Sequence, residues 1–379
     1  MLLGAWGRFL SSGRPRNFLK EVGVIAFCGA LYLGIKGYYF GIADHAYFVP
    51  GMYRMARNDF LPHAWCVDAL IPYHYFFKLI HVKLLAFMSL PTLFFLAYVS
   101  TIFLYMHALR RLCWVLFSRY SPFYFFLPIM MLWNITSIDC SYLFGENYYG
   151  IGFLGYAVAL YAFVYYLKGR IIPALTLCGV SAAVHAGIGI NLFLVVSASY
   201  LFLHAKDMGC AFKRYLIGAV FFAVIAALPI CLEMGLYEAA QRGNEHLFIE
   251  VMAFRAPHHC ILSSFRGTVL EFFMVFAMGA LAWGQQKTVR VKRPIPVFVA
   301  VILLGFIMQY FFIEVVPTPL IAKLGFFRMG VFISLAALLV VSDYIATVVQ
   351  KHSNIMVVTV AMLCLFCGTP ILGILFLLL

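Results

Sequence analysis

Three side chains that suit anion binding lie close together in the segment RAPHH (255–259). Arginine and histidine donors fit a phosphate or pyrophosphate group, because the planar guanidinium can bind two oxygens at once. Adjacent histidines on a helix point about 100° apart, so joint metal ligation would need an extended backbone. We therefore predict that Arg255, His258 and His259 bind a phosphate. A divalent cation ranks below that hypothesis, and a solvated loop is the non-functional alternative.

Three carboxylates are candidates for proton transfer or substrate binding. Asp44 follows the first long apolar run, where partial desolvation raises a carboxyl pKa and suits a general base. The alternative for Asp44 is a helix cap or an ordinary loop residue. Asp59 stands in turn-like sequence. Glu146 precedes an apolar run, where the helix dipole by itself would also favour an acid.

Two further polar residues interrupt apolar sequence. His185 lies within VHAGIGIN, in a stretch that has no Asp, Glu, Lys or Arg from 171 to 203. A histidine at membrane depth needs a partner or a cavity, so we predict either a site residue or a buried, hydrogen-bonded one. Arg328 stands at the start of a late apolar run. We predict a second phosphate contact there, with snorkelling toward the membrane surface as the alternative.

The composition shows what kind of element must position these residues. Apolar residues make up 65% of the 379-residue chain and charged residues 11%, and the mean hydropathy is +0.97. Soluble domains are about 45–50% apolar and about 25% charged. These values exclude an ordinary soluble domain, a disordered chain and a coiled coil. They predict an all-α, polytopic transmembrane helical bundle that forms a single integral membrane domain over 1–379.

A helix needs about 20 apolar residues to cross the hydrocarbon layer. Runs of this kind cover 22–40, 84–107, 122–138, 148–167, 171–203, 215–234, 268–284, 295–316, 328–349 and 355–379. The run 171–203 is long for one span, so we predict two helices that meet near His185 with Gly187 and Gly189 at the turn. This gives about eleven spans, of which 355–379 is either one span or a bent hairpin.

The distribution of charge predicts the orientation. Lysine and arginine gather in alternate loops, which the positive-inside rule assigns to the cytoplasm. Residues 1–21 then form a basic cytoplasmic N-terminus, as a retained signal anchor. Segment 41–83 becomes the first outer loop with interfacial helices, and 235–266 becomes an outer loop that contains RAPHH. The formal charge of +13 is explained by topology, so no nucleic-acid partner is expected.

Four segments resemble the GT-C superfamily of polytopic glycosyltransferases: DHAYFVPGM…NDFLP, ENYYGIGFLGYAVALYAFVYYLKGR, VHAGIGINLF and FRAPHH. The resemblance implies transfer from a polyprenyl-phosphate-linked sugar to a glycan, lipid or protein acceptor on the outer face. It implies Asp44 as the catalytic base. Substrate binding then falls to Asp59, Glu146, His185, Arg255, His258, His259 and Arg328. The similarity is to bacterial relatives, which implies the bacterial inner (plasma) membrane; no cofactor is certain, and a divalent cation stays open.

Other functions compete with this interpretation. The chain has no phosphate loop, no GxGxxG after a strand, no HExxH and no GxSxG. An O-antigen-type polysaccharide polymerase would need similar outer arginines. A lipid-linked saccharide transporter or flippase would be favoured if Glu271 and Glu314 faced each other across a cavity at the bilayer midplane. A structural subunit of a larger assembly is also compatible with the aromatic content of 18%.

Overall fold

The apolar runs form α-helices. The computed structural model describes residues 18–118, 120–133, 137–139, 141, 143–144, 146–241, 247–255, 261–264, 266–285 and 289–351. Over these ranges the chain is helical and contains no strand, and one isolated antiparallel bridge joins Phe117 to Val289. The all-α prediction is therefore confirmed. The C-terminal run 355–379 and most of the N-terminal segment 1–21 lie outside the described residues.

Helices occupy each predicted apolar run that the structure describes. They are α2 (Phe18–Lys36), α6 (Leu90–Leu116), α7 (Ser121–Trp133), α8 (Ile151–Leu167), α9 (Ile171–Val184), α10 (Ala186–Leu203), α11 (Met208–Gln241), α14 (Arg266–Gln285), α15 (Pro294–Tyr310) and α17 (Gly330–Lys351). In the described part, six helical segments are long and apolar enough to cross a membrane: Leu90–Leu116, Ala186–Leu203, Met208–Leu236, Thr268–Gln285, Pro294–Val315 and Ile321–Lys351. The chain is an integral membrane protein.

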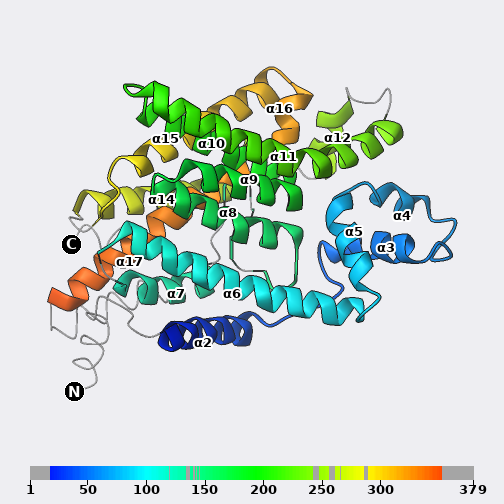
Figure 1. Cartoon of the computed structure of the whole chain (residues 1–379), viewed down its shortest axis with the longest axis horizontal. Coiled ribbons are helices and arrows are strands. Elements are labelled where there is room, and N and C mark those ends of the chain that lie inside the picture. Colours follow the sequence, from blue (N-terminus) through cyan, green and yellow to red (C-terminus); the bar gives the residue numbers. More distant parts are fainter. Residues whose placement is uncertain are drawn as a thin grey trace.

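The bundle has a buried centre and a wide apolar exterior. In Figure 1, α2 and α6 run along one side, α8, α9 and α10 lie in the middle, and α11 and α15 lie on the other side. Helix α17 packs against α7 and α14, and 89% of an 18-residue apolar stretch of the segment Ile321–Lys351 is buried. For α11 the buried share is 17%. Because α11 is apolar and exposed, its outer face suits contact with lipid chains.

The predicted break at His185 is confirmed, with a different role for the glycines. Helix α9 ends at Val184 and α10 begins at Ala186, and His185 between them is extended (φ −143°, ψ 98°). Gly187 and Gly189 therefore lie in the first turns of α10, not at the turn. A Cβ on Gly189 would overlap the backbone of Ala182. Glycine there allows α9 and α10 to fold back tightly on each other.

Residues 45–84 form a small group of helices at one end of the bundle, which we name the α3–α5 lobe. It consists of α3 (His45–Ala56), α4 (Trp65–Leu70) and α5 (Tyr75–Leu84), and it lies beside the start of α6 (Figure 1). Helix α5 packs against α6, α9 and α11. Thus the predicted first outer loop is helical and is joined to the bundle through α5.

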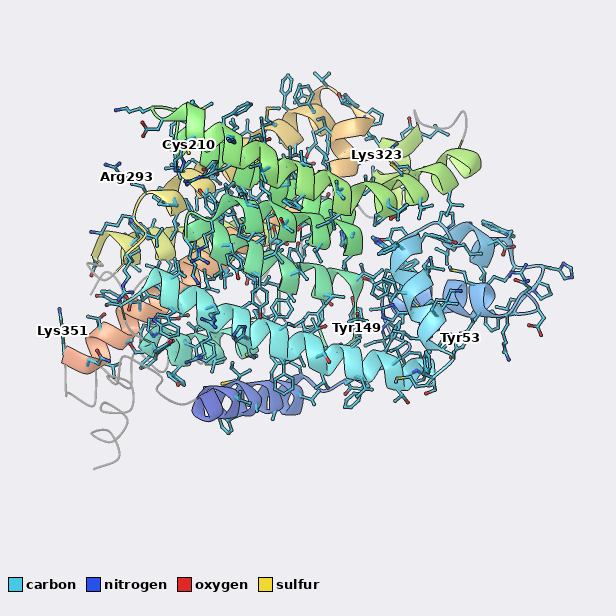
Figure 2. All side chains as sticks on the ribbon, viewed as in Figure 1. Tyr53, Tyr149, Cys210, Arg293, Lys323 and Lys351 are labelled. Carbon is cyan, nitrogen blue, oxygen red and sulfur yellow. The ribbon has the colours of Figure 1, made fainter. Side chains whose placement is uncertain are left out.

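The two ends of the bundle differ in what they carry. Figure 2 places Tyr53 in the α3–α5 lobe and Cys210, Arg293 and Lys351 at the opposite end. We name these the lobe end and the basic end. Helices α12 (Phe248–Arg255) and α16 (Pro319–Leu324) and the short turns η2 (Leu262–Ser264), η3 (Phe311–Val315) and η4 (Phe326–Met329) complete the described helices. Arg293 and Lys351, which the positive-inside rule assigns to the cytoplasm, therefore lie at the same end.

Candidate functional site

The segments that carry Asp44 and Glu146 are held together by hydrogen bonds. The backbone N–H of Tyr39 donates to the carbonyl of Asn147 (2.7 Å). The buried His45 ring lies 2.9 Å from the carbonyl of Tyr149 through Nε2, and its Nδ1 accepts from the backbone N–H of Gly41 (2.9 Å). These partners fit a neutral imidazole with its proton on Nε2. Burial lowers the pKa of His45, which favours the same neutral form.

Glu146 is a partly buried carboxyl beside Asp44. Within the described part of the chain, its Oε2 atom is buried and has no hydrogen-bond partner. Burial, together with the charge of Asp44, raises the pKa of Glu146 from 4.5 to about 8. The phenol groups of Tyr98 and Tyr32 donate to the Glu146 carbonyl at 2.8 and 3.3 Å, which fixes its backbone. Glu146 therefore holds a proton at neutral pH.

Asp44 is exposed at the first turn of α3. It occupies the N-cap position, but its side chain makes no capping hydrogen bond. The capping alternative is therefore wrong for the side chain. Since Glu146 next to it is neutral, the two carboxyls together carry one negative charge at neutral pH. A pair of this kind separates the roles of proton holder and base.

Arg328 connects two other segments of the lobe end. Its Nη1 lies 3.3 Å from Nε2 of His185, and its Nε lies 3.8 Å from Oδ2 of Asp139. Asp139 is fully buried, and its oxygens accept from the backbone N–H and the hydroxyl of Ser141 at 3.1 and 2.8 Å. The Arg328 side chain is only 21% exposed. The snorkelling alternative is wrong, because the guanidinium is directed at partners inside the protein.

His185 faces both Arg328 and the α3–α5 lobe. Because the guanidinium can only donate, Nε2 of His185 accepts, and a neutral ring then carries its proton on Nδ1. A Cβ on Gly187 would lie 3.1 Å from Nη1 of Arg328, so glycine leaves room for the guanidinium. The ring of His74 lies 5.0 Å from the His185 ring, centroid to centroid. His185 is thus both hydrogen-bonded and part of the candidate site.

Three residues of the lobe end were missed by the sequence predictions: His74, Lys78 and Glu233. The backbone N–H of His74 donates to Oε1 of Glu233 (3.1 Å), and the His74 ring is 4.0 Å from the same oxygen. Lys78 is fully buried, and its Nζ donates to the carbonyls of Leu70 and Ile71. Lys78, one of two lysines in the apolar sequence YFFKLIHVKL, was the available signal for this site.

Burial and neighbouring charge shift the pKa values of two of these residues. Burial lowers the pKa of Lys78 from 10.5 to about 7, although the carboxylate of Glu233 partly opposes the change. Burial also lowers the pKa of His74 to about 3, with the positive charges of Lys78 and Arg328 acting in the same direction. His74 is therefore neutral, and Arg328 is a permanently charged cation close to it.

The remaining predicted site residues are not joined to this group. Asp59 lies in an exposed turn between α3 and α4, away from the contacts of Asp44 and Arg328. Arg255 ends α12, but its side chain lies outside the described residues. His258 and His259 also lie outside them, so phosphate binding by RAPHH stays a prediction. Over the described ranges, no group of three or more His, Cys, Asp or Glu residues could hold a metal ion.

The site combines two chemical features at one end of an apolar bundle. One is a carboxyl pair that holds a single proton, and the other is a guanidinium oriented by an imidazole and a buried carboxylate. Tyr156 of α8 links them, because α8 begins shortly after Glu146 and the Tyr156 hydroxyl donates to the Arg328 carbonyl (3.2 Å).

Comparison with protein-family models, curated proteins and solved structures gives no match for this chain.

Proposed function

We propose that this chain is a membrane glycosyltransferase that moves a sugar from a polyprenyl-phosphate carrier to an acceptor on the outer face of the membrane. The observation that carries the proposal is the shared location of a base and an anion-binding group. Asp44 lies beside Glu146, and Arg328 lies beside His185. Tyr156 of α8, the helix that follows Glu146, donates its hydroxyl to the Arg328 carbonyl. The apolar exterior of the bundle suits the isoprenoid tail of the donor.

The proposed reaction is a direct displacement at the anomeric carbon. Asp44 accepts the proton of the acceptor hydroxyl, and that oxygen forms the new bond to the anomeric carbon. The bond between the anomeric carbon and the lipid phosphate breaks, and the phosphate leaves with the electron pair. Arg328 stabilises the negative charge on the leaving phosphate, and such preorganised donors contribute a few kcal/mol each. RAPHH would supply further donors to the same phosphate.

Glu146 has a supporting role in this mechanism. An ionised carboxylate next to Asp44 would repel a phosphate and raise the affinity of Asp44 for its proton. Because burial keeps Glu146 protonated at neutral pH, the pair presents one negative charge to the substrates. His185 would keep the guanidinium pointed at the donor phosphate, since its Nε2 accepts from Nη1.

The proposed topology completes this function. We assign about eleven spans, a cytoplasmic N-terminus, location in a bacterial plasma membrane, and the α3–α5 lobe as an interfacial element. Trp65 and Phe87 of the lobe region are each 80% exposed, which suits aromatic contact with the membrane surface. The lobe end then faces outward, and the basic end faces the cytoplasm.

Two native cysteines test this orientation. Cys66 is exposed in α4 at the lobe end, and Cys210 is exposed at the basic end (Figure 2). A membrane-impermeant maleimide should label Cys66 in intact cells and Cys210 only after permeabilisation. Variants Cys66→Ser and Cys210→Ser identify which site is labelled. Labelling in the reverse order would place the lobe end in the cytoplasm and remove the proposed outer reaction.

Donor binding tests the function itself. The full-length protein is reconstituted in vesicles with a panel of polyprenyl-phosphate-linked sugars, and donor binding and sugar transfer are measured. Arg328→Ala should weaken donor binding roughly 100-fold, and Arg328→Lys roughly tenfold because it keeps charge but loses the fork. Arg293→Ala at the basic end is the matched control and should bind normally. Absence of binding to every donor, or equal effects of both alanine variants, would contradict the proposal.

The same assay separates the competing functions. A polymerase would join preassembled saccharide units, and a transporter would move donor across the vesicle without forming a new glycosidic bond. The hypothesis of a transporter gains no support from Glu271 and Glu314, the two glutamates on which it depends. Glu314 accepts from the backbone N–H of Ser263 (3.2 Å), and Glu271 is exposed on α14.

A further inference from the structure

The basic end contains three cations that come together from two elements. Arg111 lies in the last turns of α6, and Lys168 and Arg170 flank the turn between α8 and α9. Helices α6 and α8 pack directly against each other. Gly169, between the two cations, has φ +69°, a conformation that favours glycine. This turn ends α8 and places Arg170 close to Lys168, whose ammonium is also close to Arg111 of α6.

Arg111 is oriented by a chain of hydrogen bonds. Its Nε–H donates to Nε2 of His107 (3.4 Å), so Nδ1 of His107 carries the ring proton and donates to the Tyr161 hydroxyl (2.6 Å). The Tyr161 hydroxyl in turn donates to the carbonyl of Leu104 (3.4 Å). Among the described residues, no group accepts a hydrogen bond from the two Nη atoms of Arg111.

The three cations lack an anionic partner. In the described part of the chain, none of them is ion-paired with a carboxylate. Burial lowers the pKa of Lys168, and the positive charges of Arg111 and Arg170 lower it further. The Lys168 ammonium also lies 5.9 Å from the centre of the Tyr165 ring. A bound anion with several acceptor oxygens would relieve this repulsion.

An apolar surface continues from the cations along α6. Leu104 lies two turns before Arg111, on the same face of the helix, and its side chain is 40% exposed. The rise of an α-helix separates the two positions by about 10 Å. A ligand with a phosphate at Arg111 and a hydrocarbon chain along Leu104 would satisfy both surfaces. A free phosphate would satisfy only the first.

We propose that Arg111, Lys168 and Arg170 form a binding site for the phosphate headgroup of an anionic phospholipid at the basic end of the bundle. The acyl chain lies along the exposed face of α6 that carries Leu104. This site is separate from the donor site at the lobe end and does not depend on the proposed transferase activity. It binds lipid of the leaflet that faces the basic end.

Native mass spectrometry of the purified full-length protein tests the proposal. Protein is released from mixed phosphatidylglycerol and phosphatidylcholine nanodiscs, and the retained lipids are counted. We expect preferential retention of phosphatidylglycerol. The variant R111Q/K168Q/R170Q should lower that preference roughly tenfold or more, since each juxtamembrane cation contributes to the binding of anionic lipid.

The matched control removes three other cations at the same end. Lys206, Lys213 and Arg214 are exposed near Cys210, and K206Q/K213Q/R214Q should keep the preference. Equal losses in both triple variants would mean general attraction of charge and overturn the site. Tyr161→Phe breaks the support of Arg111 without changing charge, so it should lower the preference a few-fold. Retention unchanged in Tyr161→Phe would contradict the oriented geometry.

Inorganic phosphate distinguishes a lipid site from a free-anion site. Added phosphate at millimolar concentration should leave phosphatidylglycerol retention unchanged, because the acyl chain adds binding that a free ion lacks. Full displacement by phosphate, or absence of any preference between the two lipids in the parent protein, would overturn the proposal. A thermal melt of each variant shows whether it is folded.

Discussion

The lobe end and the basic end both contain clustered charged side chains, but the two ends differ in how far these side chains are buried and paired. At the lobe end, Lys78 and Arg328 are mostly buried, and each has partners inside the protein. At the basic end, Lys168 and Arg170 are exposed, and within the described residues they have no carboxylate partner. A buried charge without partners costs several kcal/mol, whereas an exposed one is stabilised by water or lipid headgroups. Charges at the lobe end can therefore specify a geometry, and those at the basic end can specify an orientation and a lipid contact.

The largest expected effect on stability comes from removing the contacts that Arg328 makes with Asp139 and His185. Arg328→Ala leaves Asp139 as a buried carboxylate without its cation, so the free energy of unfolding should fall by about 3 kcal/mol. Denaturant unfolding of the detergent-solubilised protein measures this change. Arg170→Ala at the basic end should change it by less than about 0.5 kcal/mol. Equal effects at the two ends would contradict the comparison.

Glu146→Gln should change how stability depends on pH. The pKa of Glu146 is raised to about 8 in the folded protein, so folding binds a proton between about pH 4.5 and pH 8. Its contribution is therefore complete below pH 4.5 and is lost as the pH rises to 8. The variant should be more stable than the parent at pH 9, by on the order of 2 kcal/mol. Glu250→Gln, on the exposed face of α12, is the control and should leave the profile unchanged.

Lys78→Met should produce a smaller change in the pH dependence of stability, because the contribution of Lys78 to stability changes with pH in the opposite direction to that of Glu146. The pKa of Lys78 is lowered to about 7, so the unfolded chain binds more protons than the folded protein between about pH 7 and pH 10.5. Stability from this residue therefore rises with pH over that window. Melting temperatures at pH 7 and pH 9.5 should show a weaker rise for Lys78→Met than for the parent. An unchanged slope would mean that Lys78 is already solvated in the folded protein.

The smallest effect is expected at Asp59. Because this carboxylate lies in an exposed turn of the lobe, Asp59→Asn should leave stability and sugar transfer within about twofold of the parent. A large loss of transfer with normal folding would show that the substrates extend over α3 and α4. Asp59 would then belong to the substrate-binding site, as the resemblance to the GT-C superfamily implies.

The fold could be predicted from the sequence more completely than the site could. Each described apolar run contains a helix because lipid requires the backbone to satisfy its own hydrogen bonds. His185 and Arg328 were recognised singly as polar residues in apolar sequence. Their pairing was not predictable, since they are far apart in the chain and meet only through the packing of η4 on α10. Lys78 was missed because its segment was interpreted as an outer loop, and burial comes from the tertiary fold.

Single-turnover sugar transfer by the variant Asp44→Asn tests whether Asp44 is the general base of the proposed reaction. The amide keeps the shape of the side chain and cannot accept the acceptor proton as a base. We expect donor binding within about twofold of the parent and transfer slowed at least about 100-fold, as is typical for loss of a general base. Transfer within a few-fold of the parent rate, in a variant that binds donor normally, would contradict the assignment of Asp44 and of the lobe end as the reactive end.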